Sequence, residues 1–313
     1  MAIRLLHVRT VRFSIAAAAV AGLAVAATAT ATAASPSAPS TDQPASGSAG
    51  RQAQANTKLV EYFSDQLFND FNLSVVGKYV SPDYLQHNPT VGNGPAALEQ
   101  FVTGVHAQYP KLKFTTIRAV AEGDLVFLQN QNVVAPGATP LDDFDVYRVD
   151  NGKIVEHWDV LESQPSSSAN GNSYASELSK PESDYAPASV TAQDKGLVLD
   201  YLTEVTQDHE PSAIGQYVAP SLYQHDPTLA NGSAAIEQSY ASLLAQNPYY
   251  GVQIAQVAAE GDLVAVHAHV RDTPSALGQS VVYLFRVRDG KIVEEWDSTE
   301  NVPATSANDN TMF

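Results

Sequence analysis

The sequence predicts an α+β protein built from two tandem copies of one domain, each with helices followed by a curved antiparallel sheet. Three blocks of sequence recur at a single offset of 138 residues, and the spacing of apolar residues changes in each copy from helical to alternating. The blocks are GKIVEHWD at 152–159 and GKIVEEWD at 290–297, QHNPT at 86–90 and QHDPT at 224–228, and AEGDLV at 121–126 and 259–264. A period this long indicates a duplicated domain, because solenoid units are much shorter.

The first half of each copy is expected to be helical. In copy one, apolar residues recur at helical spacing from Leu59 to Phe68, after Thr57, which can cap a helix. A short second helix is expected over 73–80. A third begins at Gly94-Pro95, because proline suits a first helical turn. Residues 84–89 are expected to be extended, since a residue that precedes proline avoids the α region.

The second half of each copy alternates apolar and polar residues and is rich in β-branched and aromatic types, which predicts strands. In copy one the strands are expected at 112–120, 125–133, 144–149 and 153–161. Copy two repeats the order, with helices at 192–206, 212–218 and 233–245 and strands at 251–257, 263–270, 280–287 and 291–297. Each copy is therefore expected to pack three helices on an antiparallel sheet of four to six strands.

The segments outside the two copies differ in composition. Arg4, Arg9 and Arg12 precede an Ala-rich apolar run at 15–27, which is typical of a cleaved signal peptide and predicts a secreted protein with no membrane segment in its mature form. The expected divisions are a signal peptide at 1–34, a disordered tether at 35–56, domains at 57–162 and 191–301, a linker at 163–190 and a loose tail at 302–313.

The composition also limits the partners. The formal net charge is −17, and losing the three arginines of the signal peptide would take it to about −20, which argues against nucleic acid and anionic membranes. There is no cysteine, so neither disulfides nor thiol chemistry are available.

Together these motifs resemble the SnoaL-like family, the polyketide-cyclase branch of the nuclear transport factor 2-like superfamily. The resemblance rests on YLQHNP at 84–89 with Gly94, GDLV at 123–126, DVYR at 145–148 and the block at 152–159. It implies a cone, in which a bent sheet wraps around a cavity that three helices close. Members catalyse ring-closing aldol condensations without metal or cofactor, and relatives include isomerases, dehydratases, epoxide hydrolases and pure binding domains. The fold alone therefore does not give the function.

The resemblance implies that the catalytic acid/base is Asp159, with Asp297 as its counterpart in copy two. A second polar position 14 residues earlier corresponds to Asp145, and to Tyr283 in copy two. A three-residue turn with a bulge at Gly152 would place Asp145 opposite His157, whereas a two-residue turn at 151–152 would place it beside Trp158. We favour the bulged form, because it groups Asp145, His157 and Asp159 on one face. The alternative role of Asp159 is to accept hydrogen bonds at the end of a strand.

The candidate ligand-binding residues of copy one flank this position. His87 and Asn88 orient a ligand carbonyl, pair with a carboxylate, or fix a turn before Pro89 through local hydrogen bonds. Tyr84 belongs either to the core or to the rim, and Trp158 either to the core or to the cavity wall. The corresponding candidates in copy two are His225, Asp226, Tyr283 and Glu295. Because Asp226 replaces Asn88 and Glu295 replaces His157, the two cavities are expected to differ chemically.

Two functions remain open at this point. The first is an exported, cofactor-free lyase or isomerase that acts on a small, mostly apolar carbonyl compound. The second is a non-catalytic ligand-binding or assembly module, with the two domains paired through their sheet faces as an intrachain pseudo-dimer or a homodimer. No metal site is assigned, although His267 and His269 share a strand face and would need a third ligand, such as His225, Asp297 or Glu295, to hold an ion.

Overall fold

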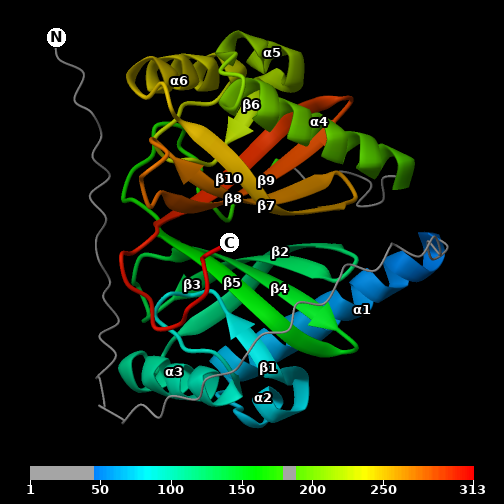
Figure 1. Ribbon diagram of the computed structural model, residues 1–313, viewed down its shortest axis with the longest axis vertical. Helices are drawn as coiled ribbons and strands as arrows, with labels where there is room; N and C mark the ends of the chain where they lie inside the picture. The colour runs from blue at the N-terminus through cyan, green and yellow to red at the C-terminus, as the bar shows by residue number, and fades with distance from the viewer. Residues whose placement is uncertain (1–45, 179–187) are drawn as a thin grey trace, which may run out of the picture.

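The chain consists of two halves with the same architecture, as the computed structural model shows for residues 46–178 and 188–313 (Figure 1). The expected signal peptide lies outside these residues, as does the first part of the expected tether. The helices of the first half are α1 (Ser46–Ser64), which continues into a π-helical segment (Asp65–Asn69), α2 (Ser74–Tyr79) and α3 (Pro95–Gln108). Its strands are β1 (Val80–Gln86), β2 (Lys113–Glu122), β3 (Leu125–Val133), β4 (Leu141–Asp150) and β5 (Lys153–Ser163).

The second half repeats this order and confirms the duplicated α+β architecture. Its helices are α4 (Ala188–Thr206), a 3-10 turn (Pro211–Ala213), α5 (Ile214–Tyr217) and α6 (Ser233–Gln246). Its strands are β6 (Val218–Gln224), β7 (Gly251–Glu260), β8 (Leu263–Arg271), β9 (Gln279–Arg288) and β10 (Lys291–Asn301). Within the described ranges, none of the helices combines the length and the apolar character that crossing a membrane requires.

Each sheet has five strands, in the order β1-β5-β4-β3-β2 in the first half and β6-β10-β9-β8-β7 in the second. The four expected strands pair antiparallel, and the segment expected only to be extended adds a fifth strand, β1, parallel to β5. This pairing aligns Gln86 with His157. The loop that follows β1 is therefore held beside the end of the last strand, where the candidate site lies.

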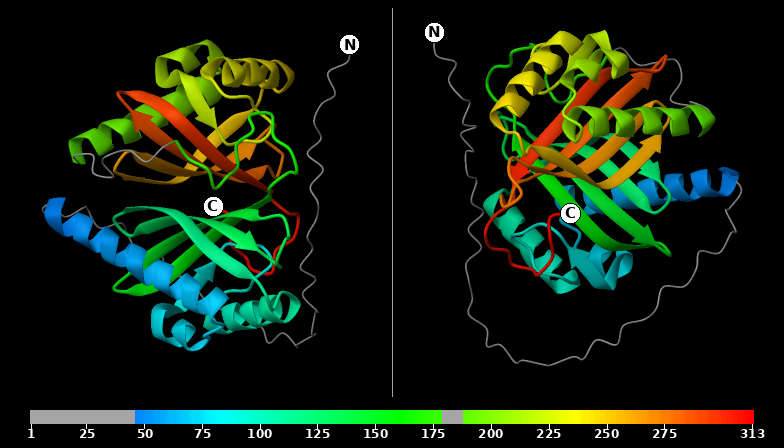
Figure 2. Two further views of the ribbon diagram at one scale, coloured as in Figure 1. Left: turned by 180° about the vertical axis from the view of Figure 1, so that it is seen from behind. Right: turned by 45° about the horizontal axis from the view of Figure 1, so that its top comes forward.

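The two faces of each sheet bury different partners. Helices cover one face in each half, and the other faces of the two sheets pack against each other, so that the helices lie outermost (Figure 2). Because side chains alternate along a strand, one strand serves both layers of core. The layer between the sheets is apolar and contains both tryptophans: Val120, Phe127, Phe144, Val146, Trp158 and Val160 from the first half, and Ala258, Ala265, Val282, Leu284 and Trp296 from the second.

The contacts between the sheets are reciprocal. Ala121 N donates to Glu260 Oε2 and Ala259 N donates to Glu122 Oε2, both at 2.9 Å. Thr299 N donates to Glu162 Oε2 at 3.0 Å, and Leu161 N lies 3.5 Å from Glu300 Oε2. In each pair the second contact joins the residues that correspond to the first under the 138-residue repeat. This is the pattern of an isologous interface, in which each partner contributes the same patch.

The C-terminal segment expected to be a loose tail is instead bound to the first half. Asn308 Nδ2 donates to Asn88 O at 2.8 Å and to Val91 O at 2.7 Å, and Asn310 Nδ2 donates to Gln86 O at 2.9 Å. Asparagine side chains thereby satisfy backbone carbonyls of an irregular loop, which would otherwise lack partners. The expectation of a loose tail at 302–313 was therefore wrong.

The beginning of the expected linker makes the same contacts with the second half. Asn170 Nδ2 donates to Asp226 O at 2.6 Å and to Leu229 O at 2.9 Å, and Asn172 Nδ2 donates to Gln224 O at 2.7 Å. The sequence carries a signal for this, because SANGN at 168–172 recurs as SANDN at 306–310 at the same offset. The duplication thus extends further than the first three blocks indicate, and each copy binds its terminal segment to the other copy.

Helix α1 also begins earlier than expected. The tether prediction at 35–56 was wrong for residues 46–56, which are helical. Ala53 is buried in the helix–sheet core, and Asn56 Nδ2 donates to Gly123 O at 3.1 Å. The Ala, Gln and Arg residues of this segment favour a helix, and the turn at Gly123 gives it a tertiary contact that composition does not reveal.

Candidate functional site

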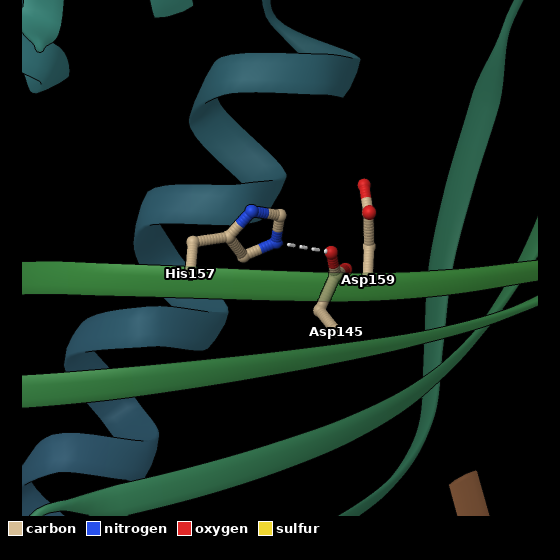
Figure 3. Close-up of side chains that lie close together, drawn as sticks. All are labelled: Asp145, His157 and Asp159. Carbon is tan, nitrogen blue, oxygen red and sulfur yellow. Dashed lines mark hydrogen bonds and ion pairs between the residues drawn. The ribbon is translucent and has the colours of Figure 1, made fainter. Parts of the chain in front are cut away.

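The turn between β4 and β5 sets the geometry of the site. It is a two-residue turn in which Asn151 and Gly152 have φ values of 49° and 74°, and an extra residue, Val155, follows in β5 as a bulge. As a result Asp145 pairs with Asp159, not with His157 or Trp158, so both registers considered from the sequence were wrong. The bulge shifts the pairing by one residue beyond the register that the two-residue turn alone would give. Asp145, His157 and Asp159 still share one face of the sheet, as expected (Figure 3).

These three side chains form the centre of the site. His157 Nε2 lies 2.7 Å from Asp145 Oδ1, and Asn88 Nδ2 donates to Asp159 Oδ2 at 2.7 Å. Asn130 Nδ2 donates to Asp145 Oδ2 at 2.8 Å. Strands β3, β4 and β5 and the loop after β1 therefore each contribute one or more polar groups to one buried cluster.

The hydrogen bonds of Gln86 fix the tautomer of His157. Gln86 Oε1 accepts from the backbone N of Asn88 at 2.9 Å, which identifies this amide atom as the oxygen. The same oxygen lies 3.0 Å from His157 Nδ1, so that Nδ1 carries a hydrogen and donates it. The lone pair of Nε2 in a neutral ring would then face Asp145 Oδ1. One proton must lie between these two atoms, because two lone pairs would repel each other at this distance.

Burial determines which partner holds that proton. Desolvation lowers the pKa of His157 to about 4, although the charge of Asp159 opposes this effect. Desolvation, followed by the neighbouring charge of Asp159, raises the pKa of Asp145 well above its usual range. Both shifts favour the neutral pair, in which the Asp145 carboxylic acid donates to a neutral His157 imidazole.

Asp159 has a different environment. Burial raises the pKa of Asp159, while the charge of His157 and the hydrogen bond from Asn88 lower it. Its Oδ1 atom is enclosed and has no hydrogen-bond partner among the residues that the structure describes. Asp159 thus has an oxygen left free to accept a proton, and the same holds for Oδ1 of Asp143 on β4.

Several polar members of the cluster were not predicted from the sequence. Asp143 is buried, its Oδ2 accepts from Asn132 Nδ2 at 2.6 Å, and its pKa is raised well above the usual range by burial and then by Asp145 and Asp159. Gln86 and Asn130 were also not identified. The available signal was the alternation of Asn130 with Asn132 and of Asp143 with Asp145, since both pairs interrupt otherwise apolar strands on one face.

His87 and Trp158 lie on the opposite side of the sheet from Asp159. The ring of His87 stacks on Trp158 with centroids 4.4 Å apart, and its Nε2 and Nδ1 atoms contact Glu156 Oε1 at 2.9 Å and Thr311 O at 2.5 Å. Trp158 belongs to the layer between the sheets. Their assignment as ligand-binding residues in the cavity of Asp159 is therefore corrected. Trp158 faces away from Asp159 because adjacent residues of a strand face opposite sides, and His87 lies on the same side as Trp158 because its ring stacks on the indole.

The other two candidates of copy one point toward the site. Tyr84 is buried with the helix–sheet core, and its hydroxyl accepts from Gln86 Nε2 at 3.0 Å. Asn88 uses its Oδ1 atom for the local turn, accepting from Thr90 N at 2.8 Å, and its Nδ2 atom for Asp159. Asn88 therefore combines the two alternatives considered for it, the turn contact and the carboxylate contact.

The second half places Asp297 opposite Tyr283, with Glu295 on the same face. Glu295 Oε2 accepts from Gln224 Nε2 at 3.2 Å, and burial raises the pKa of Glu295 to about 8. Burial also raises the pKa of Asp297 well above its usual range, and Asp226 is the strongest of the neighbouring charges that add to this shift. This cluster thus has the carboxyl groups of Asp226 and Glu295 where the first half has the amide of Asn88 and the imidazole of His157.

The three histidines considered in the second half, His225, His267 and His269, lie away from Asp297. The His225 ring stacks on Trp296 with centroids 4.5 Å apart, and its nitrogens contact Glu294 Oε1 at 3.0 Å and Ser173 O at 2.8 Å. Its assignment to the cavity is corrected for the same reason as that of His87. His267 lies between Gln256 and Ser280, at 2.6 and 2.7 Å, and His269 stacks on Phe313.

The residues that are spaced for a metal ion are those of the first half. Among the described residues, Asp145, His157 and Asp159 offer ligand atoms that all lie within 4.8 Å of one another. The other ring nitrogen of His157, Nδ1, donates a hydrogen bond to an amide oxygen, as histidine ligands commonly do. An ion would, however, have to displace the proton between Asp145 and His157. That proton already satisfies both His157 Nε2 and Asp145 Oδ1.

Two surface hollows lie elsewhere. One, of about 330 Å³, lies between the expected linker and the second half and is lined by Ser166, Tyr174, Tyr223 and His225 among others. The other, of about 300 Å³, lies beside Tyr249 and Arg271. Neither is lined by Asp145, His157 or Asp159.

Comparison with known proteins gives the family. The SnoaL-like domain model matches residues 60–157 and again residues 198–295. A search of curated proteins found no match.

Three solved structures illustrate the likeness, each over about one copy of the repeat. A protein described as a polyketide cyclase from Acidithiobacillus ferrooxidans is 17% identical over 36% of this chain and 90% of its own, with a TM-score of 0.30. A nuclear transport factor 2-like protein of unknown function from Mesorhizobium loti is 17% identical over 36% and 93%, with a TM-score of 0.31. A SnoaL-like polyketide cyclase from Agrobacterium tumefaciens is 13% identical over 34% and 91%, with a TM-score of 0.30.

Proposed function

The chain belongs to the SnoaL-like family, with one family domain in each half, and from this we propose that its first half performs cofactor-free acid/base chemistry on a small, mostly apolar carbonyl compound. The reaction class is that of a lyase or isomerase. The observation that carries the proposal is the pairing of a carboxylate that has a free oxygen, Asp159, with a neutral Asp145–His157 pair that holds a proton. Neighbouring groups whose pKa values are pushed apart by their surroundings are typical of acid/base sites.

Each group has a distinct part in this chemistry. Asp159 Oδ1 accepts a proton from the carbon next to the ligand carbonyl, and the electrons of the broken C–H bond move to the carbonyl oxygen as an enolate. The Asp145–His157 pair is the source from which that oxygen is protonated. Asn88 holds Asp159 in place, and its hydrogen bond to Oδ2 opposes the rise in pKa that burial causes, which favours the ionised form of the base.

We assign the second half a supporting role. Tyr283 and Glu295 occupy the positions of Asp145 and His157, and Asp226 occupies that of Asn88. Burial, and after it the neighbouring charge of Asp226, raises the pKa values of Glu295 and Asp297, so that neither is a ready base near neutral pH. The reciprocal contacts between the sheets support an intrachain pseudo-dimer, in which the second half completes the surface that the first half would otherwise expose.

The start of the sequence supports export with removal of the signal peptide, as inferred from its three arginines and apolar run. The acidic net charge supports a role that involves neither nucleic acid nor membrane in the mature form.

The decisive experiment is to identify small molecules that co-purify with the secreted protein and to follow their conversion by mass spectrometry. Wild type is compared with Asp159→Asn and with the matched variant Asp297→Asn. Asp159→Asn should retain the ligand and lose turnover, while Asp297→Asn should behave as wild type. Unchanged turnover in Asp159→Asn would exclude this residue as the base. A bound ligand that no variant converts would favour the non-catalytic binding module.

A further inference from the structure

We propose that the C-terminal segment at 306–311, which belongs to the second half, positions the acid/base group of the first half. This inference builds on the proposed site but makes its own prediction about the state of His157. The segment leaves β10 and crosses to the loop after β1, in red beside cyan in Figure 1. The residues that it contacts lie at the end of β1, which carries Gln86, and in the loop that follows, which carries Asn88.

One set of contacts leads to His157. Asn310 Nδ2 donates to Gln86 O at 2.9 Å and to Asn93 Oδ1 at 2.7 Å, and Asn93 Oδ1 in turn accepts from Gln86 N at 2.9 Å. The backbone of Gln86 is therefore held on both its N–H and its C=O group. Its side-chain oxygen is the acceptor that fixes the tautomer of His157. Asn310 thus acts on the imidazole through a single intervening residue.

A second set of contacts leads to Asp159. Asn308 Nδ2 donates to the backbone oxygens of Asn88 and Val91, at 2.8 and 2.7 Å. Asn88 then donates its side-chain amide to Asp159. Ala307 N also donates to Pro89 O at 2.7 Å, so that the segment holds consecutive residues of the loop. Both side chains that reach the acid/base group from this loop depend on a segment supplied by the other half.

The repeat provides a matched control. Asn170 and Asn172 make the corresponding hydrogen bonds from the first half to the second, around Gln224 and Asp226. Removing either pair loses the same kinds of contact and loosens the attachment between the halves to a similar extent. Removal of Asn308 and Asn310 alone should alter His157.

The test uses the full mature chain labelled with ¹⁵N, and follows the His157 ring by NMR as a function of pH, with the signal identified by its loss in His157→Gln. In wild type the pKa of His157 is expected at about 4. In the Asn308→Ala/Asn310→Ala variant the ring signals should shift and the pKa should rise toward its usual value of 6.5. In Asn170→Ala/Asn172→Ala both should remain as in wild type.

Two results would overturn the inference: an unchanged His157 titration in the Asn308/Asn310 variant, or the same change in both variants. If the double variant does not fold, Asn310→Ala alone is used, and the expected results are the same. The readout needs no ligand, so it separates this inference from the proposed function. A failed turnover assay with an altered His157 titration would reject only the proposed function.

Discussion

Asn88 donates a hydrogen bond of 2.7 Å to Asp159 in the first half, whereas the equivalent residue of the second half, Asp226, presents a like charge to Asp297. The backbone around both residues is similar, since each is the second residue after the first strand of its half and each accepts from the backbone N of a threonine two residues later. A change from amide to carboxyl at this position therefore gives Asp159 and Asp297, which occupy corresponding places in the repeat, different neighbours.

Exchanging these two residues should exchange the ionisation behaviour of their partners. Asn88→Asp should raise the pKa of Asp159, because it removes a donor and adds a like charge, and Asp226→Asn should lower the pKa of Asp297 for the opposite reason. Carboxyl ¹³C chemical shifts, followed as a function of pH, measure both values. Changes of the same sign in the two variants would contradict this account.

The stability of the folded chain should fall as pH rises from acid to mildly alkaline, and Glu295 should contribute to this fall. Burial raises the pKa of Glu295 from 4.5 to about 8, so the folded state retains a proton that the unfolded state loses. This contribution is complete below the unfolded pKa of 4.5 and is lost as pH rises through 8. Its size is on the order of a few kcal/mol, at about 1.4 kcal/mol per pH unit of difference.

Urea unfolding of wild type and Glu295→Gln at pH 5, 7 and 8.5 measures this effect. The variant should lose less stability over this range, because glutamine does not titrate. Asp142, which is buried, and Glu162 and Glu300, which are partly buried, also have raised pKa values and will still contribute, so the difference between the two proteins gives the share of Glu295. Parallel pH profiles would show that Glu295 titrates normally.

The apolar layer between the sheets should be a major source of stability. Leu284 lies in this layer and is 2% exposed, and its truncation to Ala should cost about 2–5 kcal/mol. Leu277→Ala is the matched control, since Leu277 is 54% exposed and should change stability by less than about 0.5 kcal/mol. Thermal or urea unfolding measures both. Similar losses in the two variants would indicate that the sheets are not closely packed.

A side chain at Gly278 should destabilise the fold more than one at Gly137, because both the backbone and the surrounding atoms oppose it. Gly278 and Gly137 have almost the same φ, 79° and 81°, but a Cβ atom at Gly278 would lie 2.3 Å from Val270 O, whereas Gly137 has open space around it. Gly137→Ala should therefore cost only the backbone strain of about 1–2 kcal/mol. Gly278→Ala should cost about 1–3 kcal/mol more in steric strain. Equal losses on urea unfolding would exclude the steric contribution.

Local sequence was sufficient for most of the helices and strands and for the face that carries the site, but not for the start of α1 or for the pairing of β1. The order of helices and strands follows from the period of the apolar residues, and both halves could be assigned because three blocks repeat at one offset. Asp145, His157 and Asp159 were placed on one face because alternation along a strand is a local property. Their exact pairing was not local, since the bulge at Val155 depends on packing against β4.

Contacts between distant residues decided the rest. Whether His87 and Trp158 faced the cone or the opposing sheet could not be read from copy one alone, because this depends on the second half being packed against it. The motif SANGN and its repeat SANDN were visible in the sequence, but a short polar motif does not show which carbonyls it will bind. The sequence by itself therefore determined a duplicated α+β domain with an acidic face on its last strands. Only the tertiary structure decided which groups meet there and that each copy binds the other's terminal segment, because hydrogen bonding and burial are set by residues far apart in the chain.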